Sequence, residues 1–184
     1  MRKTVLVPLA DGFEEIEAVT IIDILRRAGI EVIVAGVGGR QVTGSHGITV
    51  EANVLLEQYE GTPDAVVLPG GMPGAKNLKE SAALRDILHQ MKKANKLIGA
   101  ICASPAVVLA SYGFLDGKRA TCYPGFENQL GPKVTFSKER VVHDGQIITS
   151  RGPGSALEFS LELVKELVGA PMAEKLSQDT IAKT

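Results

Sequence analysis

Residues 97–111 read LIGAICASPAVVLAS, a stretch that indicates a strand, a tight turn and a helix in immediate succession. Leu97–Ile101 is an uninterrupted apolar run with the length of a buried strand. Ser104 followed by Pro105 is typical of a helix N-cap with proline at the first helical position. A buried strand that leads directly into a helix is the repeating unit of α/β folds.

The same alternation extends over most of the chain. Further apolar runs predict strands at Thr4–Pro8, Glu31–Gly36, Ala65–Leu68 and Gln146–Ser150. Helical periodicity covers Glu15–Ala28, Ser81–Ala94, Ser104–Ser111, Ser155–Val168 and a short, frayed final helix in 172–184. Strands spaced by helices predict a mainly parallel central sheet with helices on both faces.

Turn and capping residues add detail to this α/β pattern. Asp116-Gly117 and Asp144-Gly145 are typical of hairpin turns, so a few antiparallel strands are expected beside the main sheet. Ser155 with Glu158 predicts a capping box at the start of the last long helix.

Composition limits the class of protein. A length of 184 residues fits one domain (1–184), and 45% hydrophobic residues suit a globular core. The formal charge of −1 argues against a specific nucleic-acid binder and a membrane-surface protein, which are usually basic. Neither a membrane span nor a signal peptide is recognisable, and two cysteines are too few for a disulfide framework. A cytoplasmic protein is expected.

Ligands in such sheets bind beyond the carboxyl ends of the strands. Three segments follow predicted strands there, namely Ala10–Glu17, Pro69–Gly74 and Cys102–Pro105. Cys102 stands before a helix start, which lowers a thiol pKa and favours the reactive thiolate. A buried structural cysteine is the alternative. Cys122 has no helix start beside it, so we expect it to be inert.

Glu17 is the second candidate. It shares a helical stripe with Ile21, Ile24 and Ala28, so its carboxylate is expected to point inward. A buried carboxylate needs a partner or holds a proton, and beside a thiolate it would be a protonated hydrogen-bond donor. An ordinary glutamate at the helix edge is the alternative.

The remaining polar motifs are less specific. The glycines of Pro69–Gly74 match neither a dinucleotide nor a phosphate loop, although they can form an anion nest or simply a tight turn. The histidines lack metal-ligand spacing, so no metal site is expected. They are expected at the surface, although His46 could reach the crevice.

Four ordered motifs together carry a resemblance to a known family. They are ADGFEEIEAV (10–19), VVLPGGMPGAKNL (66–78), IGAICASPAVVLA (98–110) and TSRGPGSALEF (149–159). The chain resembles the ThiJ/PfpI superfamily, and most closely its Parkinson-disease-protein branch. The resemblance implies a flavodoxin-like three-layer sandwich, similar to class I glutamine amidotransferase domains, that usually forms a homodimer.

The resemblance also implies roles for particular residues. Cys102 matches the nucleophile or oxidation-sensitive cysteine, and Glu17 matches the protonated glutamate beside it. Gly70, Gly71 and Ala103 match backbone groups around the substrate oxygen. A further pocket segment matches Ser150, Arg151, Gly152 and Pro153.

This sequence departs from some relatives at two positions. Tyr123 stands where those relatives place a histidine near the cysteine, and a cysteine peptidase needs such a base. His46 stands where a close relative has arginine, which changes how the pocket would bind anions. A peptidase is therefore less well supported.

Two function classes follow from the resemblance. The first is cofactor-free conversion of reactive α-oxoaldehydes, such as methylglyoxal and glyoxal, to hydroxy acids (glyoxalase III), or of their early glycation adducts on proteins or nucleotides (deglycase). Cys102 would attack the aldehyde and Glu17 would move the proton. The alternative is a redox-sensing stress protein or chaperone that acts through oxidation of Cys102. A binding scaffold with a structural cysteine is the third possibility.

Overall fold

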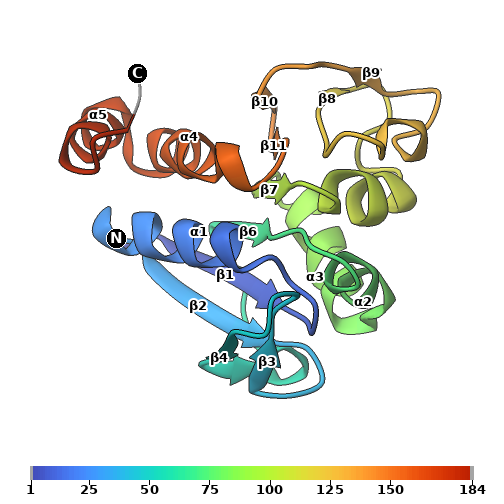
Figure 1. Ribbon diagram of the computed structural model, residues 1–184, viewed down its shortest axis with the longest axis horizontal. Coiled ribbons are helices and arrows are strands. Elements are labelled where there is room, and N and C mark those ends of the chain that lie inside the picture. The colour runs from blue at the N-terminus through green and yellow to red at the C-terminus, as the bar shows by residue number, and fades with distance from the viewer. Residues whose placement is uncertain (1, 183–184) are drawn as a thin grey trace.

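The structure is a computed structural model that describes residues 2–182. Its centre is a seven-stranded sheet in the order β10-β11-β7-β6-β1-β2-β5 (Figure 1). The strands are β1 (Thr4–Leu9), β2 (Glu31–Gly36), β5 (Val54–Leu55), β6 (Ala65–Leu68), β7 (Leu97–Ile101), β10 (Val141–Asp144) and β11 (Ile147–Ser150). All neighbours pair in parallel except β10 with β11. The predicted mainly parallel sheet is confirmed.

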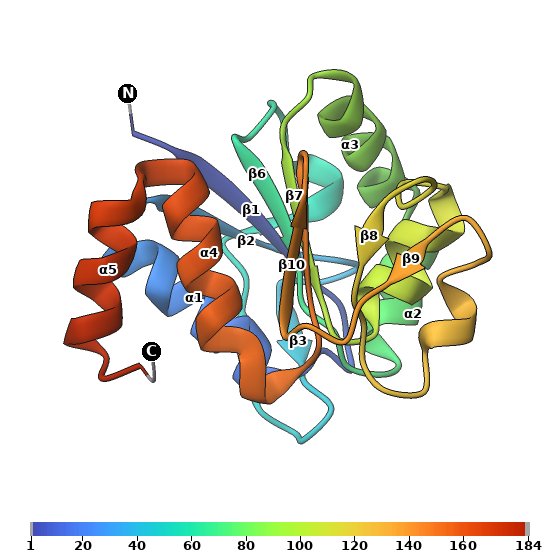
Figure 2. The same ribbon diagram turned by 90° about the horizontal axis from the view of Figure 1, so that it is seen from above.

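Helices cover both faces of this sheet, as Figure 2 shows. On one face lie α1 (Glu15–Arg27), α4 (Ala156–Val168) and α5 (Ala170–Asp179); on the other lie α2 (Gly74–Glu80) and α3 (Ala82–Lys93). Two small sheets add the antiparallel pair β3 (Gln41–Thr43) and β4 (Thr49–Glu51) and the parallel pair β8 (Arg119–Ala120) and β9 (Thr135–Phe136).

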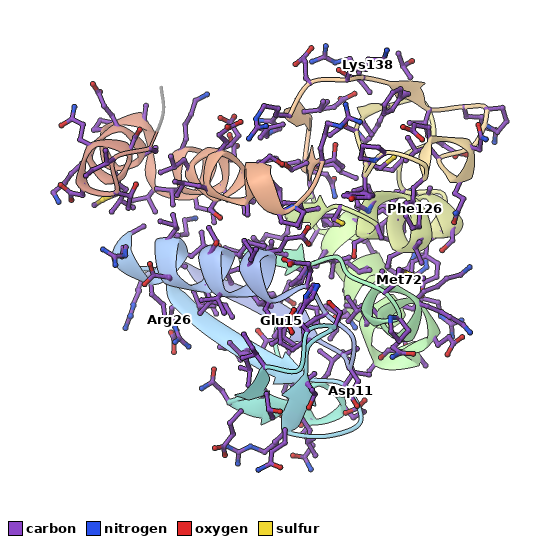
Figure 3. The ribbon with its side chains drawn as sticks, viewed as in Figure 1. Asp11, Glu15, Arg26, Met72, Phe126 and Lys138 are labelled. Carbon is purple, nitrogen blue, oxygen red and sulfur yellow. The ribbon has the colours of Figure 1, made fainter. Side chains whose placement is uncertain are left out.

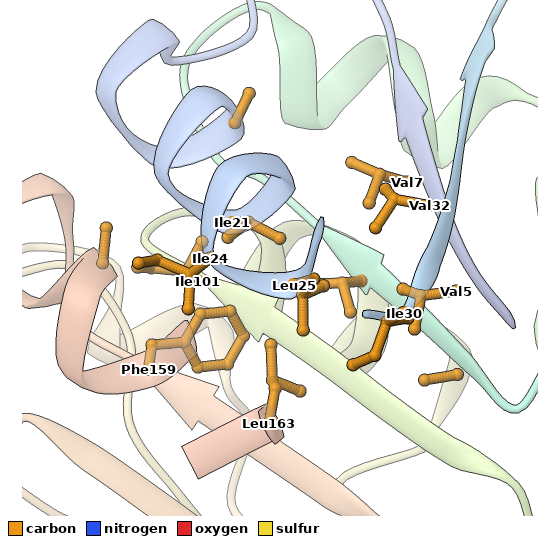
Figure 4. Close-up of a cluster of buried hydrophobic side chains, with 14 of the residues drawn as sticks. Val5, Val7, Ile21, Ile24, Leu25, Ile30, Val32, Ile101, Phe159 and Leu163 are labelled. Atoms are coloured by element: carbon orange, nitrogen blue, oxygen red, sulfur yellow. The ribbon is translucent and has the colours of Figure 1, made fainter. Parts of the chain in front are cut away.

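The core between α1, α4 and the sheet fixes where α1 lies. Ile21 and Leu25 of α1 are fully buried and pack with Phe159 and Leu163 of α4 (Figure 4). Glu17 belongs to the same buried stripe as Ile21, so packing of the apolar residues carries its carboxylate inward. The predicted inward orientation of Glu17 is confirmed.

The topology brings the candidate segments together. From β1 the chain first adds β2 on one side and later returns to place β6 on the other side of β1. This reversal is a topological switch point, where the loops that follow neighbouring strands leave a crevice. Glu17 lies in the first turn of α1, just after the loop that follows β1, and the loops after β6 and β7 carry Gly70 and Cys102.

Several local predictions are wrong, for identifiable reasons. The segment after Ser104 is a π-helical turn (Pro105–Leu109) and a 3-10 turn (Ala110–Tyr112) instead of a regular α-helix, and the Ser104 hydroxyl does not cap it. Glu158 pairs with Arg140 Nε at 2.8 Å, so it does not form the predicted box with Ser155.

Two further details differ from the sequence pattern. Asp116-Gly117 precedes β8, which pairs in parallel, so it forms a turn but no hairpin. The helix α2 was not expected, because its seven residues are too short for a clear periodicity. The predicted frayed end lies partly in residues 183–184, outside the described residues.

None of the helices within residues 2–182 is both long enough and apolar enough to cross a bilayer.

Candidate active site

Cys102 occupies the sharp turn at the end of β7. Its φ of 65° lies in the left-handed region, which a non-glycine residue adopts only when its surroundings hold it there. Its N–H donates to Ser150 O at 2.9 Å, and its carbonyl accepts from the Tyr123 N–H at 2.8 Å. The two flanking segments therefore fix the turn, and the side chain stays 7% exposed.

Ser104 connects this turn to the glycine-rich loop after β6. Its buried hydroxyl donates to Pro69 O at 2.5 Å. Ser104, which the sequence suggested as a helix cap, instead links two loops of the site by this hydrogen bond. The hydrogen bond holds the Cys102 turn and the Pro69–Gly74 loop at a fixed position relative to each other.

Glu17 reaches the site from the first turn of α1. Its N–H donates to the Glu14 carboxylate at 2.8 Å, so Glu14 is the N-cap that starts the helix. The Glu17 side chain is fully buried, and its Oε2 accepts from the Gly70 N–H at 2.7 Å. Its Oε1 is buried without a hydrogen-bond partner among the described residues. A buried oxygen without a donor favours the protonated acid.

Close packing explains the glycines at this point. A Cβ on Gly70 would lie 2.5 Å from Cys102 Cβ and 2.9 Å from Glu17 Oε2. Gly71 has a φ of +88°, and a Cβ there would lie 2.5 Å from Glu14 N. Only glycine lets the loop approach both catalytic candidates.

Backbone donors surround the Cys102 sulfur. The backbone N–H groups of Gly71 and Ala103 act to lower the pKa of the Cys102 thiol. The Gly70 N–H is engaged by Glu17 and is not free for a substrate oxygen. The Gly70 N–H therefore holds the Glu17 carboxyl, and the N–H groups of Gly71 and Ala103 are the remaining candidates for binding a substrate oxygen.

The thiol and the carboxyl influence each other strongly. Burial raises the pKa of Glu17 to about 7, against the lowering effect of the Gly70 N–H and the Cys102 thiol. Burial and the Glu17 charge raise the pKa of Cys102 to about 12. The prediction that the helix start lowers the thiol pKa is wrong, because burial and the adjacent carboxylate outweigh the backbone donors.

The same values revise the predicted protonation of Glu17. With a pKa of about 7, this carboxyl is about half protonated at neutral pH and ionised above it. Once Glu17 has ionised, the pair retains one proton, which either group can carry. The arrangement can thus form a thiolate by moving that proton from sulfur to carboxylate.

Cys122 contrasts with Cys102. Its side chain is fully buried, and burial with the charge of Glu127 raises its pKa to about 11. No backbone donors to its sulfur accompany this shift. Complete burial fits the predicted inert thiol, whereas the pKa does not, because the pKa of Cys102 is raised further.

His46 is tied to Glu15. Its ring Nδ1 lies 2.8 Å from Glu15 Oε2, and its N–H donates to Glu15 Oε1 at 2.7 Å. Burial would raise the pKa of Glu15, but these hydrogen bonds lower it to about 2; the same contact raises the pKa of His46. With its ring engaged by Glu15, His46 is poorly placed to act as the base for Cys102.

Glu14 completes a polar cluster that sequence spacing did not reveal. One possible ligand atom from each of Glu14, Glu15 and His46 lies within 4.8 Å of the others. His46 is distant from both glutamates in the sequence and meets them because the loop between β3 and β4 folds onto the start of α1. Their hydrogen bonds to one another and to the backbone account for the cluster.

The predicted pocket residues Tyr123, Arg151 and Pro153 do come together. They line a cavity of about 320 Å³ beside the Cys102 turn. Lys138 also lines it and was missed, because its place before β10 carries no motif.

Comparisons with known proteins match nearly the whole chain. The model of the DJ-1/PfpI family matches residues 3–166. A Danio rerio protein, "Parkinson disease protein 7 homolog", is 42% identical over 186 residues, or 98% of each chain. A Caenorhabditis elegans protein, "glutathione-independent glyoxalase DJR-1.2", is 35% identical over 174 residues, or 94% of this chain and 91% of that protein.

Relatives differ in length. The Arabidopsis thaliana "Protein DJ-1 homolog B" is 42% identical over 95% of this chain, which spans 40% of that protein. Among solved structures, the oxidized DJ-1 of Toxoplasma gondii superposes with a TM-score of 0.96 at 45% identity, covering 99% of this chain and 100% of that one.

Proposed function

Since the chain belongs to the DJ-1/PfpI family, we propose that it converts α-oxoaldehydes such as methylglyoxal, or their early glycation adducts, to hydroxy acids through Cys102 and without a cofactor. One observation carries the proposal. A buried carboxyl with a pKa of about 7 and one unpartnered oxygen lies beside a cysteine on a constrained turn. The glyoxalase name of one relative supports the same reaction class.

The first step forms the carbon–sulfur bond. Ionised Glu17 takes the thiol proton while Sγ attacks the aldehyde carbon, and the carbonyl electron pair moves to oxygen. The N–H groups of Gly71 and Ala103, which favour the charged form of the sulfur, can stabilise that oxyanion. Glu17 then returns the proton to this oxygen, which gives a hemithioacetal and restores the carboxylate.

The second step moves hydrogen between adjacent carbons. Glu17 removes the proton from the former aldehyde carbon, which gives an enediolate. The hydroxyl proton on the former aldehyde oxygen passes to the neighbouring oxygen, and Glu17 delivers its proton to the neighbouring carbon. The product is a thioester of a 2-hydroxy acid. Water hydrolyses it, releasing the acid and restoring the thiol. The sequence adds one water overall and requires no oxidant or reductant.

The direct test is lactate formation from methylglyoxal by wild type beside Cys102→Ser. Wild type is expected to form lactate, and Cys102→Ser is expected to form none. A Cys122→Ser variant serves as the matched thiol control and should retain activity. Lactate formation that survives in Cys102→Ser would refute the proposal.

A redox-sensing role is the second candidate. The same donors at Gly71 and Ala103, with a protonated Glu17, would stabilise a sulfinate on Cys102. The test is peroxide treatment followed by peptide mass analysis. Two oxygen atoms added selectively at Cys102 support this role, and equal oxidation of Cys122 argues against it.

A peptidase remains less well supported. Tyr123 stands near Cys102 through its backbone, but a tyrosine hydroxyl is a poorer general base than a histidine ring at neutral pH. The His46 ring is engaged by Glu15. We expect little peptide hydrolysis, whereas the aldehyde reaction can use Glu17.

A further inference from the structure

The cavity beside the Cys102 turn has an unbalanced charge. It is lined by Tyr123, Pro124, Lys138, Arg140, Arg151, Gly152, Pro153, Gly154 and Ser155. Three of these residues are cationic and none is acidic. A volume of about 320 Å³ is at the lower end of the range for small-molecule sites.

Two of the three cations are free of carboxylate partners. Arg140 is neutralised by Glu158, whose oxygens lie 2.8 and 2.9 Å from its Nε. Lys138 and Arg151 form no salt bridge within residues 2–182, and Figure 3 shows Lys138 on the segment between β9 and β10. An unpaired lysine and arginine that line one cavity attract an anion.

The Arg151 guanidinium is also held in place. It lies over the Phe136 ring, 6.0 Å from its centre, and Nη1 donates to Lys138 O at 3.4 Å. Positioning before binding lowers the cost of ordering a long side chain around a ligand. The nearby Glu127 carboxylate accepts from the Gly125 N–H at 2.7 Å and does not line the cavity.

The cavity adjoins the nucleophile through two short backbone links. The Tyr123 N–H donates to Cys102 O, and the Cys102 N–H donates to Ser150 O, the residue before Arg151. The Tyr123 ring closes over Gly152, where a Cβ would lie 3.0 Å from Cδ2. Cys102 itself does not line the cavity, so the substrate that could use it is one whose tail extends past the turn from the sulfur.

We propose that Lys138 and Arg151 form an anion subsite, so that the preferred substrate of the Cys102 reaction is an α-oxoaldehyde whose tail bears a carboxylate or phosphate. This inference rests on the proposed function and specifies its substrate class. The reaction at the aldehyde end is unchanged, while the anionic tail supplies binding energy and orientation.

The test compares methylglyoxal with 4,5-dioxopentanoate, in which the methyl group is extended by CH₂COO⁻. Wild type is expected to have the higher kcat/KM for the anionic substrate. Lys138→Met and Arg151→Gln should each lower the ratio of anionic to neutral kcat/KM by about 10-fold, the weight of one charge-assisted hydrogen bond. Lys93→Met, a surface lysine on α3, should leave both values unchanged.

A binding measurement separates failure of this inference from failure of the proposed function. Inorganic phosphate should raise the Tm of Cys102→Ser, and Lys138→Met in that background should abolish the shift. If no lactate is formed, the proposed function fails. The change in Tm caused by phosphate then decides by itself whether the anion subsite exists. If turnover is measured, an unchanged ratio in both cavity variants overturns the inference.

Discussion

At the residue scale, the proton shared by Glu17 and Cys102 determines when the sulfur is reactive. The pKa of Glu17 is raised to about 7, so the pair loses its first proton near neutrality and keeps the second to about pH 12. Between these values a constant fraction of molecules holds the proton on Glu17 and the charge on sulfur.

The pair makes a specific prediction for alkylation. The rate of iodoacetamide labelling at Cys102 should rise as pH passes through about 7 and then level off. In Glu17→Gln the rise in labelling rate near pH 7 should vanish. The pKa of the Cys102 thiol should then fall below about 12, because the carboxylate charge is gone. A wild-type rate that keeps climbing far above pH 7 would argue against a shared proton.

The two thiols should differ in the same experiment. Cys102 is expected to label well before Cys122, because Cys122 is fully buried, whereas Cys102 is slightly exposed and lies beside the Glu17 carboxyl. Peptide mass analysis distinguishes the two sites. Equal labelling would remove the basis for choosing Cys102 as the nucleophile.

Proton transfer by Glu17 can be tested separately from folding. Glu17→Gln keeps the side-chain volume and can still interact with the Gly70 loop, yet it carries no exchangeable acid proton. Methylglyoxal turnover should fall by about 10²-fold or more. The control is Glu57→Gln, a change at an exposed glutamate outside the site, which should leave methylglyoxal turnover unchanged. Wild-type turnover in Glu17→Gln would make Glu17 a structural residue.

Sequence predicted these residues better than their charge states. The apolar stripe of α1 placed Glu17 inward, and the strand end placed Cys102 in the crevice. The direction of the Cys102 pKa could not be predicted, since it depends on burial and on a carboxylate from another element. The role of Gly70 likewise became visible only when its N–H was seen to bind Glu17.

At the scale of elements, the site depends on loops that touch without intervening side chains. Gly70→Ala would press a methyl group against Cys102 Cβ and Glu17 Oε2. Overpacking of this kind costs about 1–3 kcal/mol of unfolding free energy. Chemical denaturation and turnover should both reveal the damage. Gly39→Ala, with its nearest neighbour at 3.7 Å, is the matched control, and equal effects of the two changes would contradict this packing.

Regular elements were predictable where one pattern dominated. Three of the five predicted strands have the observed bounds, since buried apolar runs have few alternatives. Two local features could not be predicted from the sequence. The π-helical turn after Cys102 replaces a capped helix because Ser104 donates to Pro69 O. The capping box at Ser155 is absent because Glu158 pairs with Arg140. Tertiary hydrogen bonds replaced local caps there.

At the scale of the whole molecule, the resemblance to the family and the flavodoxin-like arrangement of a mainly parallel sheet with helices around it are confirmed. The homodimer stays a prediction. Ile16, Val19 and Ile48 are exposed large apolar residues, and a cavity of about 360 Å³ lies between α1 and β4. A second copy could cover this face.

Light scattering at micromolar concentration tests that prediction. Wild type should have twice the monomer mass of 19.5 kDa, and Val19→Glu should shift it towards the monomer, because a charge would be buried in the interface. A wild-type species of 19.5 kDa would contradict the dimer.

The central claim is that Cys102 and Glu17 together isomerise an α-oxoaldehyde by proton transfer. Proton NMR of methylglyoxal turnover in D₂O, with chelator-treated protein, tests it most directly. The account predicts lactate that carries solvent deuterium at C2, because the Glu17 proton exchanges with water, and it predicts no lactate from Cys102→Ser. Lactate without deuterium at C2 from wild type, or lactate formed by Cys102→Ser, would contradict it.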